Sequence, residues 1–363
     1  METVITKRDN LLSVLRRRGY LLEEAPVELS FCPALEQKFA AYAKENGLPE
    51  NTWYRDYFGV PYRELPDSIC PQGGDVHRKY YGELRYGTFI DQWGVAFSPG
   101  SDPASHLTRM LHPMERFDSV EQVQAYAFPV PCENGAQQRA AADRIKAEGY
   151  AAYANMPCTI WERAWYLRGM ENLMADMLTD APMAEAVFEK VTLESIRRAE
   201  RFAAAGADIL HLGDDVGMQR TIMMSETLYR EWIQPRLRRV IDAAKAVKPD
   251  IIVTYHSCGY VEPLIPNLIE AGIDVLNPVQ PECMDFARLH AQYGDRLSFY
   301  GTIGTQTTMP YGTPEEVRAA VFRNLNLAGE RGGLWCTPTH VLEPEVPMEN
   351  ILAYISACRE YRG

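Results

Sequence analysis

One histidine and two cysteines follow short apolar runs of this chain and could together bind a metal ion. His256 and Cys258 come directly after the β-branched run 251–253, and Cys336 follows another apolar run at 333–335. An imidazole and two thiolates form a soft ligand set that suits zinc, and three protein ligands leave a fourth position open for substrate. The pattern therefore predicts a catalytic zinc site. The alternative is that these cysteines are ordinary buried thiols.

Strand-like and helix-like segments alternate from about residue 150 onward. Apolar runs predict strands at 151–156, 208–212, 251–255, 273–276, 297–300 and 333–335. Helix-start signals occur between them, such as Thr313, which can cap a helix that has Pro314 in its first turn. Such repeats imply a parallel sheet, and an α/β fold of the closed (β/α)8 TIM-barrel type fits best. An open, doubly wound sheet is the alternative, but no Gly-x-Gly-x-x-Gly turn follows a strand.

The first 150 residues are less regular than the rest. The segment 27–31 could be the first barrel strand, and residues 84–97 have the alternation of a β-hairpin on an insertion. No repeat or linker demands a second domain. We therefore expect residues 1–363 to form a single (β/α)8 barrel domain, with residues 1–150 holding the first strand and an irregular insertion.

Polar residues collect at the carboxyl ends of the expected strands, which is where barrel enzymes carry their chemistry. In chain order these residues are Asn155, Asp214, Asp215, His256, Cys258, Asn277, Gln280 and Cys336. All three candidate zinc ligands should therefore lie on one face of the barrel, although Cys336 is far from the other two in sequence.

Three carboxylates are candidate catalytic residues. Asp214 or Asp215 could anchor a polar substrate group or orient a zinc ligand, or the two could be a helix cap and a solvated loop acid. Glu162 could be a general acid, a fourth metal ligand or a helix-start carboxylate. The residues expected to contact substrate are Asn155, Gln219, Asn277, Gln280 and His340.

Composition restricts the partners of this chain. The net charge is −12, which argues against nucleic acid and anionic membranes as partners. No stretch of about 18 uncharged apolar residues is present, so no membrane span is expected. The amino terminus lacks the apolar run of a signal peptide, and the eight cysteines are then expected to be thiols rather than disulfides. These features predict a cytoplasmic protein.

Three segments resemble the uroporphyrinogen decarboxylase superfamily, and the likeness covers roughly residues 150–360. They are Gly-Asp-Asp-Val-Gly-Met-Gln at 213–219, Met-Ser-Glu-Thr-Leu-Tyr-Arg at 224–230 and Gly-Thr-Ile-Gly-Thr-Gln at 301–306. His-x-Cys with a distant Cys is similar to the zinc-dependent corrinoid methyltransferases of that superfamily. These include methylcobalamin:coenzyme M enzymes and the demethylating components of O-demethylase systems. The resemblance implies zinc bound by His256, Cys258 and Cys336, and a barrel of that family with an N-terminal extension.

The chain departs from true uroporphyrinogen decarboxylases in lacking their N-terminal Arg-Gln-Ala-Gly-Arg segment. The resemblance therefore favours methyl transfer from a small methylated substrate, with an aryl methyl ether as one candidate, to the cobalt of a corrinoid. A separate corrinoid protein is the expected partner, because no Asp-x-His-x-x-Gly cobalamin signature is present. The alternatives are transfer from methylcorrinoid to a thiol, a decarboxylase-like enzyme, a zinc hydrolase with Asp215 or Glu162 as base, and a non-catalytic relative.

Overall fold

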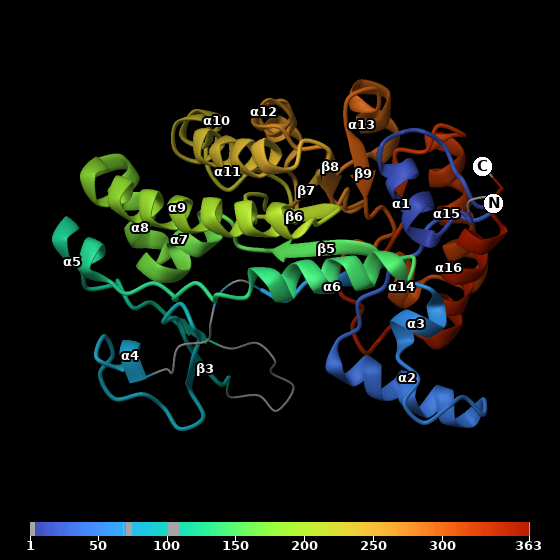
Figure 1. Ribbon diagram of the computed structural model, residues 1–363, viewed down its shortest axis with the longest axis horizontal. Coiled ribbons are helices and arrows are strands. Elements are labelled where there is room, and N and C mark those ends of the chain that lie inside the picture. The colour runs from blue at the N-terminus through green and yellow to red at the C-terminus, as the bar shows by residue number, and fades with distance from the viewer. Residues whose placement is uncertain (1–3, 68, 70–74, 101–108, 363) are drawn as a thin grey trace.

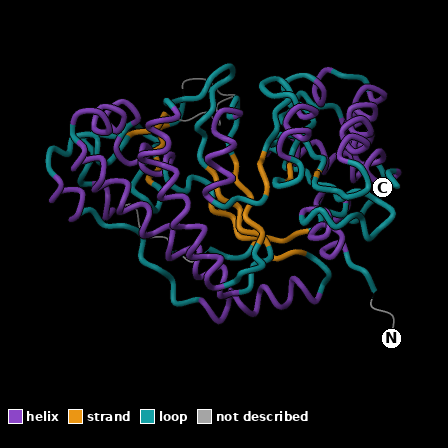
Figure 2. The backbone as a smooth tube through the Cα atoms, turned by 90° about the horizontal axis from the view of Figure 1, so that it is seen from above, coloured by secondary structure: helices purple, strands orange, loops and turns teal. Residues whose placement is uncertain are grey.

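A curled, all-parallel sheet forms the centre of the molecule (Figure 1). The computed structural model describes residues 4–67, 69, 75–100 and 109–362. The strand order of the sheet is β1-β5-β6-β7-β8-β9-β10, and every neighbouring pair is parallel. The strands are β1 (Tyr62–Glu64), β5 (Ala151–Met156), β6 (Ile209–Gly213), β7 (Ile252–His256), β8 (Val275–Asn277), β9 (Ser298–Tyr300) and β10 (Leu334–Trp335). Helices surround these strands in the view from above (Figure 2). The predicted α/β class and parallel sheet are confirmed.

The helix start predicted at Thr313 and Pro314 is confirmed. Thr313 caps α15 with a capping box, as expected, and Pro314 is its first residue. The helices are α1 (Lys7–Leu15), α2 (Pro33–Glu45), α3 (Tyr54–Phe58), α4 (Asp75–Arg78), α5 (Val120–Ala125), α6 (Gly135–Ala147), α7 (Trp161–Arg168), α8 (Met170–Thr179), α9 (Ala181–Ala205), α10 (Glu226–Leu228), α11 (Gln234–Val247), α12 (Ile265–Ala271), α13 (Phe286–Tyr293), α14 (Thr308–Tyr311), α15 (Pro314–Ala328) and α16 (Met348–Glu360). Within the described part of the chain, no helix combines the length and the apolar character needed to cross a membrane.

The expected first strand, 27–31, does not form a ladder in the sheet. It makes one parallel bridge, between Phe31 and Leu342. The Tyr354 hydroxyl accepts from the backbone N–H of Glu28 at 3.2 Å and lies 3.3 Å from the Glu28 carbonyl oxygen. This side chain therefore occupies backbone groups that a strand neighbour would need. The predicted (β/α)8 barrel is thus confirmed in part. The described residues form a curled parallel sheet of seven strands, and it is not closed into a full barrel.

Side chains occupy the gap between segment 27–31 and β1. The Tyr62 hydroxyl donates to Glu28 Oε1 at 3.3 Å, and Arg55 Nη2 donates to Ser30 Oγ at 3.2 Å. The buried Glu28 carboxylate, whose pKa is raised by burial and lowered in part by Arg55, is thus held by several partners. The segment is attached to β1 by this polar network instead of by backbone bonds.

The inside of the curled sheet is filled with aromatic side chains. The Tyr300 and Trp335 rings are stacked with centroids 4.3 Å apart, and the Tyr62 and Tyr153 centroids are 4.5 Å apart. Leucines of α1 belong to the same buried cluster. The interior is therefore a packed core, as in closed barrels, and it forms the floor beneath the carboxyl ends of the strands.

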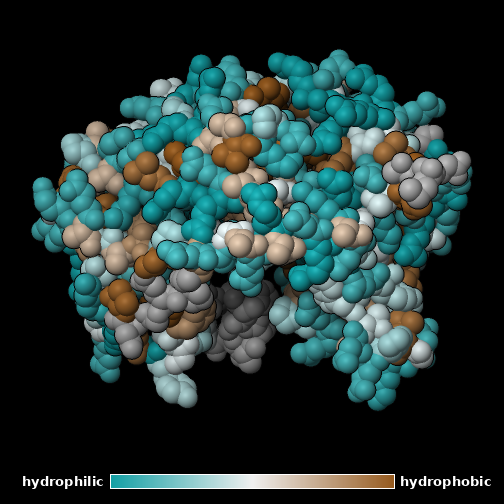
Figure 3. Space-filling view, in the orientation of Figure 1, coloured by the Kyte–Doolittle hydropathy of each residue, from teal (hydrophilic) through white to brown (hydrophobic). Residues whose placement is uncertain are grey.

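A small antiparallel sheet lies in the N-terminal insertion. It consists of β2 (Phe89–Ile90), β3 (Ala96–Ser98) and β4 (Arg109–Leu111). Phe89 pairs with Phe97 across β2 and β3, which confirms the predicted hairpin at 84–97. One expectation for the cysteines was wrong, because Cys132 is disulfide-bonded; spacing alone does not reveal such a pairing. The face in view in Figure 3 is mostly hydrophilic with scattered apolar residues.

Candidate metal and substrate site

Three side chains that can bind metal meet at the carboxyl ends of the strands: His256, Cys258 and His340. Their ligating atoms all lie within 4.8 Å of one another. Cys258 Sγ is 3.4 Å from His256 Nε2, close to the separation of about 3.5 Å that two ligands of one tetrahedral zinc would have. His256 is the last residue of β7, Cys258 follows two positions later, and His340 lies in the loop after β10.

The imidazole of His256 is oriented by a partner on the neighbouring strand. Its Nδ1 lies 2.6 Å from Asn277 Oδ1. The amide nitrogen of Asn277 donates to the Tyr300 carbonyl at 3.1 Å, so the amide oxygen is the atom presented to His256. Because that oxygen can only accept, Nδ1 carries the proton and the lone pair of Nε2 is free to face Cys258. Metal-binding histidines commonly have this arrangement.

Cys258 is held by the carboxylate that follows β6. Its backbone N–H donates to Asp215 Oδ1 at 2.8 Å, and the same oxygen is 3.6 Å from His256 Nε2. Burial raises the pKa of the Cys258 thiol to about 12, so a thiolate at neutral pH needs a cation beside it. A thiol and two imidazoles around one point fit a zinc ion, which supplies that cation.

Cys336, the expected third ligand, does not belong to this group. Its side chain is fully buried, and its Sγ lies 3.7 Å from Thr302 Oγ1. Trp335, the last residue of β10, belongs to the aromatic cluster inside the sheet, whereas Cys336 belongs to the other buried cluster, together with Tyr354 and Cys358 of α16. Cys336 therefore points outward, where its carbonyl accepts from Tyr354 of α16. His340, expected to contact substrate, occupies the third position instead.

Asp214 and Glu162 have different surroundings, although both were expected to be catalytic. The buried Asp214 carboxylate accepts backbone N–H bonds from Ile160 at 3.0 Å and from Glu162 at 2.9 Å. It therefore caps the first turn of α7, the alternative considered for this pair. Glu162 Oε1 accepts from the Tyr166 hydroxyl at 3.0 Å. Burial raises the pKa of Glu162, and the negative charge of Asp215 raises it further.

A cavity of about 390 Å³ opens beside Cys258 and His340. Its lining residues are Gly217, Met218, Gln219, Cys258, Gly259, Gln280, Thr305, Gln306, Thr339, His340, Val341 and Glu343. The side-chain amides of Gln219 and Gln306 bond each other across the cavity at 3.4 and 3.5 Å. Of the expected substrate contacts, Gln219, Gln280 and His340 line it. Asn277 binds His256 instead, and Asn155 Nδ2 lies 3.5 Å from Glu64 Oε2.

Sequence reasoning missed other residues of this region. Thr305, Gln306 and Thr339 line the cavity. Thr305 and Gln306 end the segment 301–306 that carries the family resemblance, which was the available signal, whereas Thr339 lies outside the three segments that carry it. His211 lies below His256, with ring centroids 6.1 Å apart, and its Nδ1 is 2.7 Å from Thr254 Oγ1. Burial lowers the pKa of His211 to about 3, so it stays neutral. Its position two residues before the end of β6, on the inward face, was the available signal.

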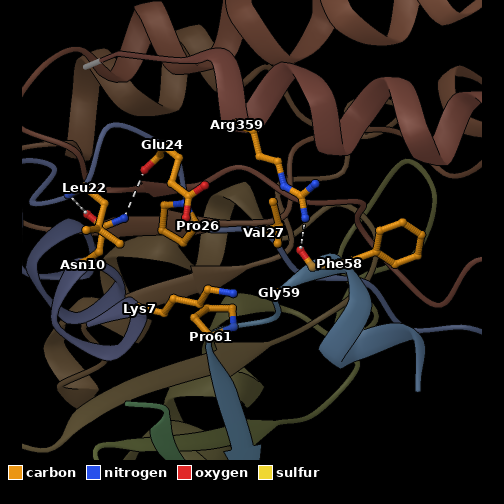
Figure 4. A pocket seen from close by; sticks show the side chains of 10 residues that line it. All are labelled: Lys7, Asn10, Leu22, Glu24, Pro26, Val27, Phe58, Gly59, Pro61 and Arg359. Carbon is orange, nitrogen blue, oxygen red and sulfur yellow. Dashed lines mark hydrogen bonds between the residues drawn. The ribbon is translucent and has the colours of Figure 1, made fainter. Parts of the chain in front are cut away.

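A second cavity, of about 230 Å³, lies next to Pro61 at the amino end of β1. Figure 4 shows Arg359 bonded to the Phe58 carbonyl and Asn10 bonded to the Glu24 carbonyl in its wall. These polar groups bind backbone atoms of the wall itself. The cavity is therefore not part of the site at the carboxyl ends of the strands.

A curled parallel α/β sheet with a nitrogen–sulfur ligand group at its carboxyl ends defines a barrel-like protein with a candidate metal site. The chain belongs to the uroporphyrinogen decarboxylase (URO-D) family, whose model matches residues 114–361. The predicted family resemblance is thus confirmed.

The curated relatives are named either as methyltransferases or as decarboxylases. A methylated-thiol–coenzyme M methyltransferase of Methanosarcina mazei is 30% identical over 207 residues, 54% of this chain and 50% of that protein. A uroporphyrinogen decarboxylase of Pelodictyon phaeoclathratiforme is 24% identical over 189 residues, 51% of each chain. The chain thus spans about half the length of these curated relatives. A solved methyltransferase from Methanosarcina mazei has the same fold, with a TM-score of 0.65, 18% identity, and coverage of 99% of this chain and 100% of that one.

Proposed function

We propose that this protein is a zinc-dependent methyltransferase that moves a methyl group from a small methylated substrate to the cobalt of a separate corrinoid protein. The observation that carries the proposal is the His256–Cys258–His340 group, which faces a cavity large enough for a small molecule. The likeness to a relative named a methylated-thiol–coenzyme M methyltransferase supports the same reaction class.

His256, Cys258 and His340 would hold the zinc ion, with His340 in the position first assigned to Cys336. These three ligands come from the end of β7, from the loop that follows it and from the loop after β10, and they would leave a fourth position for substrate. A zinc ion there, when bound, supplies a Lewis acid that makes the oxygen, nitrogen or sulfur of the substrate a better leaving group. Asn277 and Asp215 orient His256 and Cys258 around that position.

Glu162 would supply the proton that the departing group needs. The Tyr166 hydroxyl donates to its Oε1, and the backbone N–H of Asp215 also bonds this carboxylate. The raised pKa of Glu162 favours the protonated form. In the demethylation direction, Co(I) of the partner's corrinoid would supply the electron pair of the new bond to the methyl carbon and become methyl-Co(III). The bond between the methyl carbon and the heteroatom would break, and the heteroatom would keep the electron pair of the broken bond and take the proton of Glu162. Transfer in the opposite direction, from methylcorrinoid to a thiol, uses the same groups.

The other functions considered have less support. A decarboxylase acting on a tetrapyrrole with many carboxylates needs cationic side chains, and among the described residues that line the cavity there is no lysine or arginine. A zinc hydrolase with Asp215 as base would have a cysteine ligand, whereas histidines and carboxylates are usual for that role. We further infer a single (β/α)8-type domain in which segment 27–31 takes the place of the first strand.

The test is zinc content together with methyl transfer to a Co(I) corrinoid. We expect about one zinc ion per chain and methylation of the corrinoid by at least one methylated donor. His340→Ala should abolish both while the circular dichroism spectrum is unchanged. A purified, unchelated protein without zinc would contradict the proposal.

A further inference from the structure

The lining of the substrate cavity provides neutral polar groups and one carboxylate. Its polar side chains are the amides of Gln219, Gln280 and Gln306 and the hydroxyls of Thr305 and Thr339. The one formal charge outside the metal-binding group is the carboxylate of Glu343. None of the twelve described lining residues is a lysine or an arginine.

A second carboxylate faces the metal position from the side of β6. Asp215 is 41% exposed, and its Oδ1 lies 3.6 Å from His256 Nε2. The proposed zinc ion with its one thiolate ligand would carry a net formal charge of +1, which the two carboxylates of Asp215 and Glu343 outweigh. An anion that enters the cavity would meet both carboxylates, and it would lose its hydration without a lysine or arginine in the described lining to pair with. Both effects weaken the binding of an anion.

The guanidinium of Arg163 does not offset the negative charge of Asp215 and Glu343. Arg163 lies over the Trp93 ring at 4.3 Å from its centroid and pairs with Asp91 at 3.9 Å. It is not among the residues that line the cavity. Its charge is therefore directed to the insertion and away from the substrate position.

The amides, by contrast, suit a neutral polar molecule. Gln219 and Gln306 bond each other at 3.4 and 3.5 Å, distances at the weak end of the hydrogen-bond range. Each amide has one donor and one acceptor that a hydroxyl, ether or amide of a substrate could use in place of this long contact.

We propose that the site selects neutral or cationic small substrates and rejects carboxylates and sulfonates. This inference rests on the proposed zinc-dependent function, because the substrate heteroatom must reach the open metal position. It narrows the substrate class of this chain, and it implies that a sulfonated thiol is not its acceptor.

The test compares three thiols of the same two-carbon length on the zinc-loaded protein by titration calorimetry, with each dissociation constant corrected for the pKa of the thiol. They are 2-mercaptoethanol, which is neutral, cysteamine, which is cationic, and 2-mercaptoethanesulfonate, which is anionic. We expect the sulfonate to bind at least tenfold more weakly than the neutral thiol, a difference of about 1.4 kcal/mol. Equal or tighter binding of the sulfonate would overturn the inference while leaving the zinc site intact. Failure of all three thiols to bind would instead overturn the proposed open zinc position, and the inference with it.

A charge introduced into the lining gives a second, independent measurement. Relative to Gln306→Met, Gln306→Arg should raise the affinity for the sulfonate about tenfold and change the affinity for 2-mercaptoethanol much less. Gln306→Met is the matched control, since it removes the amide without adding charge. Zinc content should be the same in both variants. An unchanged sulfonate affinity in Gln306→Arg would contradict the inference.

Discussion

The Nδ1 atom of His256 lies 2.6 Å from Oδ1 of Asn277, although the two residues are on different strands. Parallel register places them side by side at the ends of β7 and β8. The contact fixes the tautomer of the imidazole and leaves Nε2 to bind a metal. A residue expected to contact substrate thus supports a candidate ligand.

Removal of this support should weaken zinc binding without removing a ligand. Asn277→Leu is expected to lower zinc affinity about 10- to 100-fold, because the ring of His256 loses its orienting acceptor. Asn277→Asp keeps an acceptor oxygen and should retain most of the affinity. Competition with a chromogenic chelator measures both variants. Equal affinity in Asn277→Leu and the unmodified protein would show that Asn277 does not orient the ligand.

His340 and Cys336 can be distinguished as third ligands. His340→Ala should lose zinc and keep its stability, because the side chain is exposed. Cys336→Ser should retain zinc but lower the free energy of unfolding by about 1–3 kcal/mol, because it places a hydroxyl in an apolar environment. Metal analysis measures the zinc content of both variants, and urea denaturation measures their free energies of unfolding. Loss of zinc in Cys336→Ser with zinc retained in His340→Ala would restore the original assignment.

Asp214 should contribute mainly to the stability of the fold, whereas Asp215 should contribute mainly to zinc binding and catalysis. Asp214→Ala removes the acceptor for two buried backbone N–H groups at the start of α7 and should cost about 1–3 kcal/mol of unfolding free energy. Asp215→Asn keeps an acceptor for the Cys258 N–H, and its main effect should fall on zinc binding and catalysis. Denaturation curves and methyl-transfer rates separate the two effects. A stable Asp214→Ala variant would argue against the capping role.

The sequence predicted the positions of most strands but not the face that each residue presents. Apolar runs placed β6 and β7 within one residue of their observed bounds. The two-residue strand β10 has no alternation from which the outward direction of Cys336 could be inferred. Among the described residues, segment 27–31 pairs with its neighbour at one bridge only, and its contact with Tyr354, 326 positions from Glu28, follows from no local pattern.

The pH dependence of methyl transfer should report on Glu162. Its pKa is raised by burial and by Asp215, and it is lowered by the bond from Tyr166. If Glu162 acts as the acid, activity is lost as the pH rises through this pKa. Tyr166→Phe removes the bond that lowers the pKa, so the alkaline limb of the rate profile should move to higher pH. Asp215→Asn should move the same limb to lower pH. If neither variant shifts the limb, Glu162 is not the group that titrates.

Close backbone contact at Gly259 should make this glycine necessary for the loop that holds Cys258. Gly259 has φ +82°, and a Cβ there would lie 2.6 Å from the Met218 carbonyl oxygen. Gly47 also has a positive φ, +68°, but a Cβ there meets nothing within 4 Å, so it is a matched control for backbone strain alone. Gly47→Ala should cost about 1 kcal/mol of unfolding free energy, whereas Gly259→Ala should cost more and also weaken zinc binding. Thermal denaturation of each variant with and without zinc measures the loss of stability and the loss of zinc binding. Equal losses in the two variants, with zinc affinity unchanged, would mean that the contact between Gly259 and Met218 does not shape the site.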